Sequence, residues 1–312
     1  FSGTVKINDE LYLSTGQKVR VKAIHAQNTS SEQGIAGQRL ALNLNADLDR
    51  TPMKRGDWLL QDEPLPPTDR ISVQILAEVP LNESQPVHIY HGASRTTGKL
   101  TLLQGKNAAK NDRTLAEIIL DSPLFLAFGD KLILRSGDTK TLIAGARVLE
   151  INSPKRHKRT EVRLNFLANL ALAENASQRI ALTLQHNATT ARQLMWTEQL
   201  TSLQLDKALA ERDAVRYQDW CFNTNYVQEK TQQILTTLST YHEQHNDQLG
   251  VSKARLYRMA TLNQPENLIH HFIDEILDDG RLQQTRGWIH LPEHKIQFNT
   301  EEKSRWTDVL NE

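Results

Sequence analysis

The run AGQRLALNL at residues 36–44, preceded by VRVKAIH at residues 19–25 and followed by KRGDWLL at residues 54–60, decides the first fold prediction. The first two runs alternate apolar and polar residues over most of their length, which is the period of a strand with one buried face. Gly, Asn, Ser or Pro bound each run, so we predict strands of a small barrel. Arg39 follows Gly37 at the start of its strand, where its side chain would stand at the barrel rim and contact a ligand.

Length and composition favour several small domains. The chain has 312 residues, 38% of them hydrophobic and 6% aromatic, which suits several modest cores better than one large core. Lys plus Arg equals Asp plus Glu at 37 each, so a nucleic-acid surface would depend on local clusters of charge. The single cysteine, Cys221, excludes an intrachain disulfide, favours a reducing compartment and is predicted to be a buried structural thiol.

Nothing in the sequence predicts membrane insertion or secretion. No apolar run approaches the roughly 20 residues of a membrane helix, and no signal-peptide pattern opens the chain. We therefore expect a cytoplasmic protein without a membrane partner.

The first half of the chain is predicted to be β-rich. Pro64, Pro66 and Pro67 form a stiff connector between residues 1–62 and a second block at residues 68–150. In that block, strands separated by polar turns predict a closed Greek-key barrel or a sandwich. The predicted strands lie at residues 71–76, 86–91, 98–103, 115–120, 131–135 and 141–149.

After Pro154, helical spacing replaces strand alternation, and the same layout occurs twice. Residues 155–227 end in a strand predicted at residues 214–222 with a short return. Residues 228–298 contain three amphipathic helices, the second opened by Ser252 and the third with Pro265 at its first position, and then a hairpin. Three helices followed by a two-stranded wing predict a winged helix. Residues 300–310 are predicted to begin a further helix within residues 299–312.

Sequence signals for catalysis are scarce. The glycines at residues 92–98 are spaced wrongly for a phosphate-binding loop, and no nucleophile elbow occurs. His242 and His245 are one residue too close for the zinc-protease helix motif, so we interpret them as residues of a solvated helix face. We predict no catalytic activity and no metal site.

Two clusters have the composition of an RNA-binding surface. Around one strand of the second barrel, polar, aromatic and basic residues gather, a mixture that suits a sugar-phosphate backbone. At the next domain junction, a basic run suits phosphate contact, with a solvated linker as the equal alternative. The first cluster comprises His88, Tyr90, His91, Ser94, Arg95, Thr96 and Lys99, and the second comprises Lys155, Arg156, His157, Lys158 and Arg159.

Taken together, several motifs resemble those of the bacterial selenocysteine-specific elongation factors, translational GTPases related to elongation factor Tu. The resemblance spans nearly the whole chain, and Asn8 stands where the family usually has Gly. It implies a mainly β and then α+β fold, with two translation-factor barrels followed by two winged helices. Besides the three opening runs, the motifs are SGTVKIND (2–9), HIYHGASRTTG (88–98), GDKLILR (129–135), LIAGARV (142–148), YHEQH (241–245) and GWIHLPEHK (287–295).

The resemblance also implies a function and partners. Family members deliver selenocysteinyl-tRNA to the ribosome at recoded UGA codons, and their distal winged helices hold a hairpin in selenoprotein mRNA. We expect the GTP-binding domain, with its GTP and Mg²⁺, to precede Phe1 and the distal winged helices to follow Glu312. The chain would then bind tRNA and link the GTPase body to the mRNA-binding arm. A winged-helix DNA-binding regulator and a protein-interaction scaffold are the alternatives.

Residue roles follow from the same resemblance. The arginine of the AGQR run belongs to the family's selenocysteine pocket, which assigns Arg39 to the aminoacyl end of the tRNA, with His25 as a second donor. A selenol is more acidic than a thiol or hydroxyl, so a selenolate beside a guanidinium is favoured over neutral serine. A surface ion pair is the alternative role for Arg39. The residues assigned to tRNA-stem phosphates are His91, Arg95 and Lys99.

Overall fold

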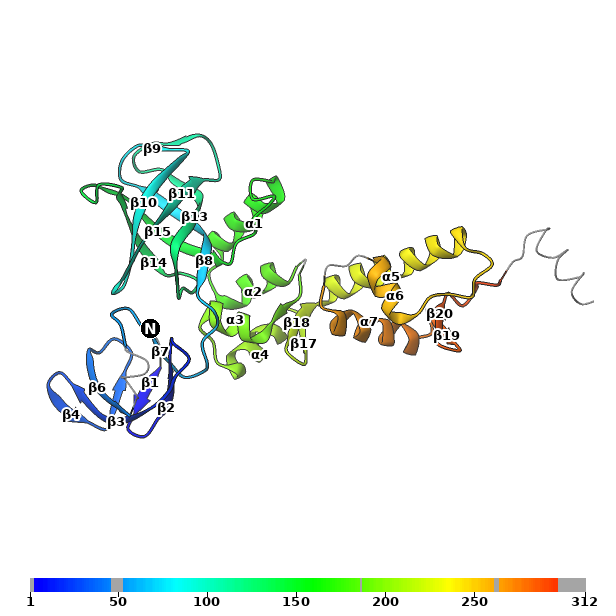
Figure 1. Cartoon of the computed structure of the whole chain (residues 1–312), viewed down its shortest axis with the longest axis horizontal. Coiled ribbons are helices and arrows are strands. Elements are labelled where there is room, and N and C mark those ends of the chain that lie inside the picture. The colour runs from blue at the N-terminus through cyan, green and yellow to red at the C-terminus, as the bar shows by residue number, and fades with distance from the viewer. Residues whose placement is uncertain (1–2, 46–52, 186, 261–263, 297–312) are drawn as a thin grey trace, which may run out of the picture. The chain divides into compact units, whose positions relative to one another are not determined.

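The computed structural model describes residues 3–45, 53–185, 187–260 and 264–296 (Figure 1). The chain divides into two compact units, of which the first contains Phe1–Leu182 and Arg192–Leu205, and the second contains Thr183–Ala191 and Asp206–Glu312. The helix predicted at residues 300–310 lies outside the described residues. None of the described helices is long and apolar enough to cross a lipid bilayer.

The N-terminal β domain is built around β3 (Lys18–Ala26), which pairs with β2, β4 and β6. The alternation predicted for residues 19–25 is confirmed at Val19 and Val21, which are buried, and an irregularity between Val21 and Ala23 shifts the next buried position to Ile24. Asn8 adopts a φ of 73°, the left-handed backbone that Asn tolerates at a turn. The other strands are β1 (Thr4–Lys6), β2 (Glu10–Leu13), β4 (Thr29–Ser31), β5 (Gln33–Ile35), β6 (Leu40–Asn45) and β7 (Leu59–Leu60).

The run at residues 54–60 is mostly a turn and only its end is a strand. The backbone N–H of Lys54 donates to the Asp57 carboxylate at 2.6 Å, and Gly56 has a φ of 100°. These two features reverse the chain, so that only Leu59 and Leu60 pair with β2.

The second β domain is a closed six-stranded antiparallel barrel in the order β10-β11-β13-β8-β15-β14 (Figure 1), which is the first of the two alternatives that the strand pattern left open. Its interior is filled by aliphatic side chains such as Ile75, Ile89 and Ile118, each fully buried. Several strands extend beyond their predicted limits because polar residues at their ends continue the ladder. The barrel strands are β8 (Thr68–Ala77), β10 (Ser84–His91), β11 (Ser94–Leu102), β13 (Arg113–Leu124), β14 (Lys131–Ser136) and β15 (Leu142–Ile151), with β9 (Leu81–Asn82) and β12 (Asn107–Ala108) forming a separate pair.

Helix α1 (Glu161–Leu172) packs on the outside of this barrel. Thr160 caps its N-terminus by accepting from the Arg163 N–H. Leu167 and Leu170 form a small core with apolar residues of β13, β15 and the segment after β11. The next helices are α2 (Ala176–Leu184), α3 (Ala191–Glu198) and α4 (Ser202–Ala210).

An apolar core of the second unit is formed by residues of its strands and of α5, α6 and α7. The strand predicted at residues 214–222 is instead a hairpin, because Gln218 adopts a φ of 54° and reverses the chain between β17 and β18. The predicted domain boundary at residues 227–228 lies inside α5, and Pro265 caps α7 instead of occupying its first position. The elements are β16 (Thr189–Thr190), β17 (Ala214–Tyr217), β18 (Trp220–Asn223), α5 (Thr224–Gln244), α6 (Lys253–Ala260), α7 (Glu266–Asp278), β19 (Gln283–Thr285) and β20 (Trp288–His290).

Candidate functional site

Arg39 and His25 lie near each other on the exposed side of the N-terminal sheet. Arg39 lies immediately before β6 and not within it. A turn at Ala36 and Gly37, closed by the hydrogen bond from the Gln38 N–H to the Ile35 carbonyl, separates β5 from β6. His25 is the cross-strand partner of Ala41, two residues after Arg39, and both His25 and Arg39 are exposed. No carboxylate in the described part of the chain forms an ion pair with Arg39, so the alternative of a surface pair is not formed with those residues.

The cations that precede His25 on β3 differ in their availability. Lys18 and Arg20 both contact Glu10, with N–O distances of 2.6 and 2.7 Å. Hydrogen bonds from Lys18 and Arg20 lower the pKa of Glu10 to about 2. Lys22 is exposed and forms no ion pair with a described residue, so it offers a matched control for Arg39.

The outer face of β11 carries a line of polar and basic side chains. Arg95, Thr97 and Lys99 are exposed, whereas the intervening residues face the barrel interior. The register places Tyr90 opposite Arg95 and His88 opposite Thr97 on β10. This surface is consistent with contact to a sugar-phosphate backbone.

The same face extends to a residue that sequence reasoning missed. Arg135 on β14 is the cross-strand partner of His88 and donates to the Thr139 carbonyl at 2.9 Å. The alternation of Lys131, Ile133 and Arg135 in the sequence contained this signal, since all three are solvent-facing in the strand.

His91 is not suited to phosphate contact, which corrects its assignment. Its side chain is 8% exposed, and Nε2 lies 3.3 Å from the Asp130 carboxylate. Its ring centroid is 6.1 Å from that of Trp58, which in turn stacks on Trp196 of α3 at 5.8 Å. A histidine enclosed by an indole and a carboxylate stabilises the fold and does not reach an external ligand.

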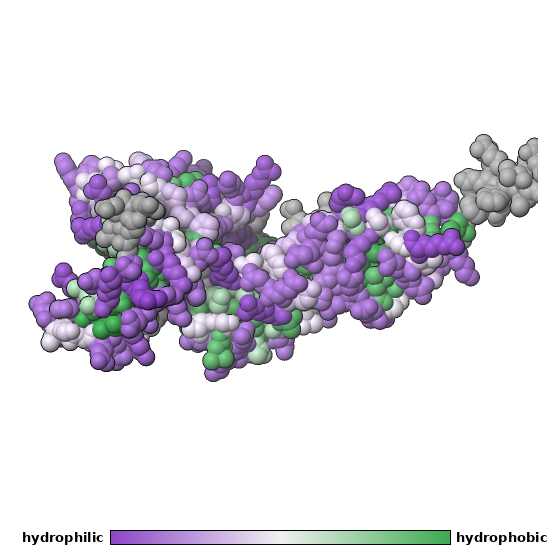
Figure 2. Space-filling view, turned by 60° about the horizontal axis from the view of Figure 1, so that its bottom comes forward, coloured by the Kyte–Doolittle hydropathy of each residue, from purple (hydrophilic) through white to green (hydrophobic). Residues whose placement is uncertain are grey.

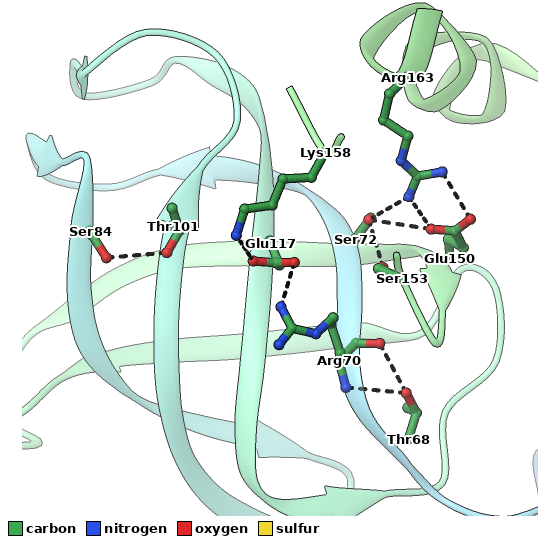
Figure 3. Close-up of polar contacts among 10 residues, drawn as sticks. All are labelled: Thr68, Arg70, Ser72, Ser84, Thr101, Glu117, Glu150, Ser153, Lys158 and Arg163. Atoms are coloured by element: carbon green, nitrogen blue, oxygen red, sulfur yellow. Dashed lines mark hydrogen bonds and ion pairs between the residues drawn. The ribbon is translucent and has the colours of Figure 1, made fainter. Parts of the chain in front are cut away.

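The basic run at residues 155–159 is divided by the structure. Lys158 and Arg159 contact the barrel, with N–O distances of 2.6 Å to Glu117 and 2.7 Å to Glu83 (Figure 3 shows the first pair). Lys155 and Arg156 are exposed and form no ion pair with a described residue. Lys158 and Arg159 are therefore already paired with carboxylates of the protein, although Arg159 stays exposed, and the prediction of phosphate contact is left to Lys155 and Arg156.

His242 is buried at 6% exposure, so its predicted position on a solvated helix face is also wrong. Its Nε2 accepts from the Leu291 N–H at 3.3 Å, and its ring stacks on that of His294 at 3.6 Å. Burial, reinforced by His294 and His290, lowers the pKa of His242 to about 4. In the described ranges, no group of three or more His, Cys, Asp or Glu side chains is arranged to hold a metal ion.

Helix α7 has the chain position of a DNA-recognition helix, but its surface is acidic. Asp274, Glu275, Asp278 and Asp279 are all exposed. Such a surface repels DNA phosphates and is unsuited to a major groove. Figure 2 shows a mostly hydrophilic surface on the visible face, with apolar residues in small separate patches.

Cys221 is fully buried, in agreement with the sequence interpretation. Burial raises the pKa of its thiol to about 11, which keeps the sulfur protonated and unreactive at neutral pH.

Family models match two regions of the chain. The model described as "Selenocysteine-specific elongation factor, beta-barrel domain" matches residues 68–155, and the one described as "Elongation factor SelB, winged helix" matches residues 235–291. The first region contains the closed barrel together with the start of its linker, and the second runs from the C-terminal half of α5 through β20.

Curated relatives match over nearly the entire chain. A selenocysteine-specific elongation factor of Haemophilus influenzae is 97% identical over 312 residues, which are 100% of this chain and 50% of that protein. The factor of Escherichia coli of the same name is 37% identical over 98% of this chain and 48% of that protein. The chain thus spans about half the length of these relatives.

The fold is also similar to that of a solved bacterial selenocysteine-specific elongation factor. That crystal structure matches 99% of this chain with a TM-score of 0.68 at 18% identity, over 48% of its own chain. At this identity the likeness shows the fold alone. Because the sequence matches run through both β domains and the helical segments that follow them, the chain belongs to the family of selenocysteine-specific elongation factors.

Proposed function

We propose that this chain is the tRNA-handling part of a selenocysteine-specific elongation factor. The observation that carries the proposal is the match to relatives of that name over the full length of the chain. The partners that we infer are selenocysteinyl-tRNA and the ribosome, with the selenoprotein mRNA hairpin held by other segments of the full-length protein. In this proposal the chain itself holds neither GTP nor Mg²⁺ and catalyses no reaction, since its sequence contains no phosphate-binding loop.

The proposal assigns Arg39 to the aminoacyl end of the tRNA. Its guanidinium is exposed and unpaired among the described residues, so it is available to an anion. A selenolate would accept a charge-assisted hydrogen bond from Arg39, and a neutral serine hydroxyl would gain much less. His25 lies close enough along the sheet register to serve as a second donor.

The proposal assigns to the tRNA backbone the outer face of β11 and the linker cations that form no ion pair with a described residue. Arg95 and Lys99 point outward from the same strand face, and Lys155 and Arg156 are solvent-exposed. Because the net charge of the chain is zero, these local groups would supply most of the salt-dependent affinity.

The deciding experiment compares selenocysteinyl-tRNA with seryl-tRNA of the same nucleotide sequence. Binding is measured across a salt series for the wild type, Arg39→Ala and the exposed-cation control Lys22→Ala. We expect Arg39→Ala to lose about 1.5–3 kcal/mol of the preference for the selenocysteinyl form, the range of a hydrogen bond to a charged group. Its salt slope should stay close to that of the wild type, because phosphate contacts lie elsewhere.

Lys22→Ala should keep the wild-type preference. If the wild type bound both aminoacyl-tRNAs equally, the assignment of Arg39 to the selenolate would be wrong. If it bound no tRNA at all, the proposed function of the chain would be wrong as well.

A further inference from the structure

The linker after the barrel is fixed where it leaves β15. The hydroxyls of Ser72 and Ser153 lie 2.7 Å apart, and the Ser153 N–H donates to the Arg70 carbonyl at 3.2 Å. The Asn152 N–H donates to the Thr68 hydroxyl at 3.1 Å. The first residues of the linker are therefore hydrogen-bonded to β8, the first strand of the barrel in the sequence.

Glu117 holds the middle of the linker. This β13 residue is 1% exposed, and its two carboxylate oxygens accept from Arg70 at 2.8 Å and from Lys158 at 2.6 Å (Figure 3). Arg159 adds hydrogen bonds to Glu83 and to the Leu102 carbonyl, at 2.7 and 2.9 Å. A buried carboxylate with two cationic partners is costly to disrupt, because removing one partner leaves buried charge uncompensated.

Helix α1 is fixed at both of its ends. At its start, Arg163 contacts the Glu150 carboxylate and the Ser72 hydroxyl, the latter at 3.1 Å (Figure 3). At its end, Arg147 of β15 donates to the Ala171 carbonyl at 2.6 Å. The linker between β15 and α1 is thus held at its start by Ser153 and at its end by Arg163. Between these two points, Lys158 attaches it to Glu117.

This arrangement separates the basic side chains of residues 155–159 into two pairs. Lys158 and Arg159 form ion pairs with Glu117 and Glu83, whereas Lys155 and Arg156 form none with a described residue. Between the pairs, His157 adopts a φ of 56°, so the backbone reverses at that residue.

The anchor lies beside the basic face of β11. Thr101 of β11 is the cross-strand partner of Glu117, and Lys99 lies two residues before Thr101. At about 3.3 Å of rise per residue, Lys99 is roughly 7 Å along the strand from the row that contains Glu117. Arg95, Lys99 and the anchored linker therefore belong to one side of the barrel.

We propose that Glu117 is a positioning residue of the RNA-binding surface. By holding Lys158 against the barrel, it fixes the linker so that Lys155 and Arg156 continue the line of phosphate contacts that begins on β11. Glu117 does not touch RNA itself. This inference rests on the proposed function, namely that the barrel and linker bind the tRNA backbone.

A purely charge-masking role for Glu117 predicts the opposite result. If Glu117 only neutralises Arg70 and Lys158, then Glu117→Gln uncovers two cations and strengthens RNA binding. If Glu117 positions the linker, the same substitution releases Lys155 and Arg156 from their fixed places and weakens binding. The sign of the change separates the two roles.

The test is a double-mutant cycle with a labelled tRNA transcript titrated across a salt series. It uses the wild type, Glu117→Gln, the pair Lys155→Met with Arg156→Met, and the triple variant. The pair should lower the salt slope by about two phosphate equivalents, roughly 1.8 for a duplex stem. Glu117→Gln should weaken binding in the wild-type background and have no further effect in the background that lacks Lys155 and Arg156.

Two further variants guard against unfolding and nonspecific charge effects. Lys158→Met releases the linker while leaving Glu117 paired with Arg70, so it should weaken binding as Glu117→Gln does, and both should speed hydrogen exchange at residues 154–159. Lys110→Met, which removes an exposed cation elsewhere on the barrel, should leave the effect of Glu117→Gln unchanged.

Three outcomes would overturn the inference. Stronger tRNA binding by Glu117→Gln would show charge masking. Unchanged binding after loss of Lys155 and Arg156 would exclude the linker from the RNA surface, while wild-type binding would leave the proposed function intact. If the wild type bound no tRNA, the proposed function would fail and this inference with it.

Discussion

A single histidine shows how burial changes the behaviour of a side chain on the second unit. His242 faces the rings of His294 and Tyr241, and the nearby titratable groups His290 and Glu293 also act on it. Its pKa in the folded protein is about 4, against an ordinary value of 6.5. The folded state therefore favours the neutral imidazole.

The resulting pH dependence has a definite sign. As pH falls below about 6.5, the unfolded chain binds a proton at His242 that the folded chain takes up only near pH 4, so stability falls through this window. We expect urea unfolding of the wild type to lose stability between pH 6.5 and pH 4, and His242→Gln to lose less. His245→Gln, at the C-cap of the same helix and less buried, serves as the control. Identical pH profiles for the wild type and His242→Gln would contradict this assignment.

Residue exposure was the least predictable property from sequence. The residues around His91 indicated an RNA-facing surface, and Arg95 and Lys99 do lie on the exposed face of the next strand, β11. His91 is buried because Trp58 and Asp130, distant in sequence, close over it. Lys158 likewise forms an ion pair with Glu117. The run of five basic residues could not predict this pair, because Glu117 is distant in sequence.

At the scale of one strand, Gly98 of β11 allows the barrel to close. A Cβ atom at this position would lie 2.2 Å from the Ile119 carbonyl oxygen and 3.1 Å from the Ile89 side chain. Since the first contact is with backbone of the neighbouring strand, β11 and β13 would have to separate.

We therefore expect Gly98→Ala to destabilise the protein by about 1–3 kcal/mol, the usual cost of overpacking. Gly145 of β15 is the matched control, because nothing lies within 4 Å of its Cβ position. Gly145→Ala should change stability by no more than about 0.5–1 kcal/mol, in the stabilising direction. Thermal unfolding would measure both, and an equal loss in the two variants would refute the steric explanation.

Elements were predicted well where one physical signal dominated. Apolar and polar residues alternate in the strands of the closed barrel, and turn residues bound each strand. The sequence therefore predicted where these strands lie. The hairpin of β17 and β18 was missed, because Gln218 and Asp219 carry no glycine signal for their turn. The start of α5 at Thr224 was also missed, since its cap, Asn223, lies at the end of a strand.

At the scale of the whole molecule, the two units each contain their own apolar core. In the first, Ile75 and Ile89 belong to the barrel cluster, whose members all lie in that unit. In the second, Phe272 of α7 packs edge-on against Phe222 of β18 with centroids 5.1 Å apart. The sequence-based division at residues 227–228 did not anticipate this sharing of a core by β18 and α7.

Because each unit has its own apolar core, we expect a core substitution to destabilise only the unit that contains it. Phe272→Ala should cost about 3–5 kcal/mol of stability in the second unit, as truncation of a buried aromatic side chain usually does. Hydrogen exchange should accelerate in α5, α6 and α7 and remain slow in β8 through β15. Ile75→Ala should produce the reverse pattern, and Leu203→Ala, at 80% exposure, should change neither. Faster exchange throughout the chain in Phe272→Ala would instead mean that the two units unfold as one cooperative structure.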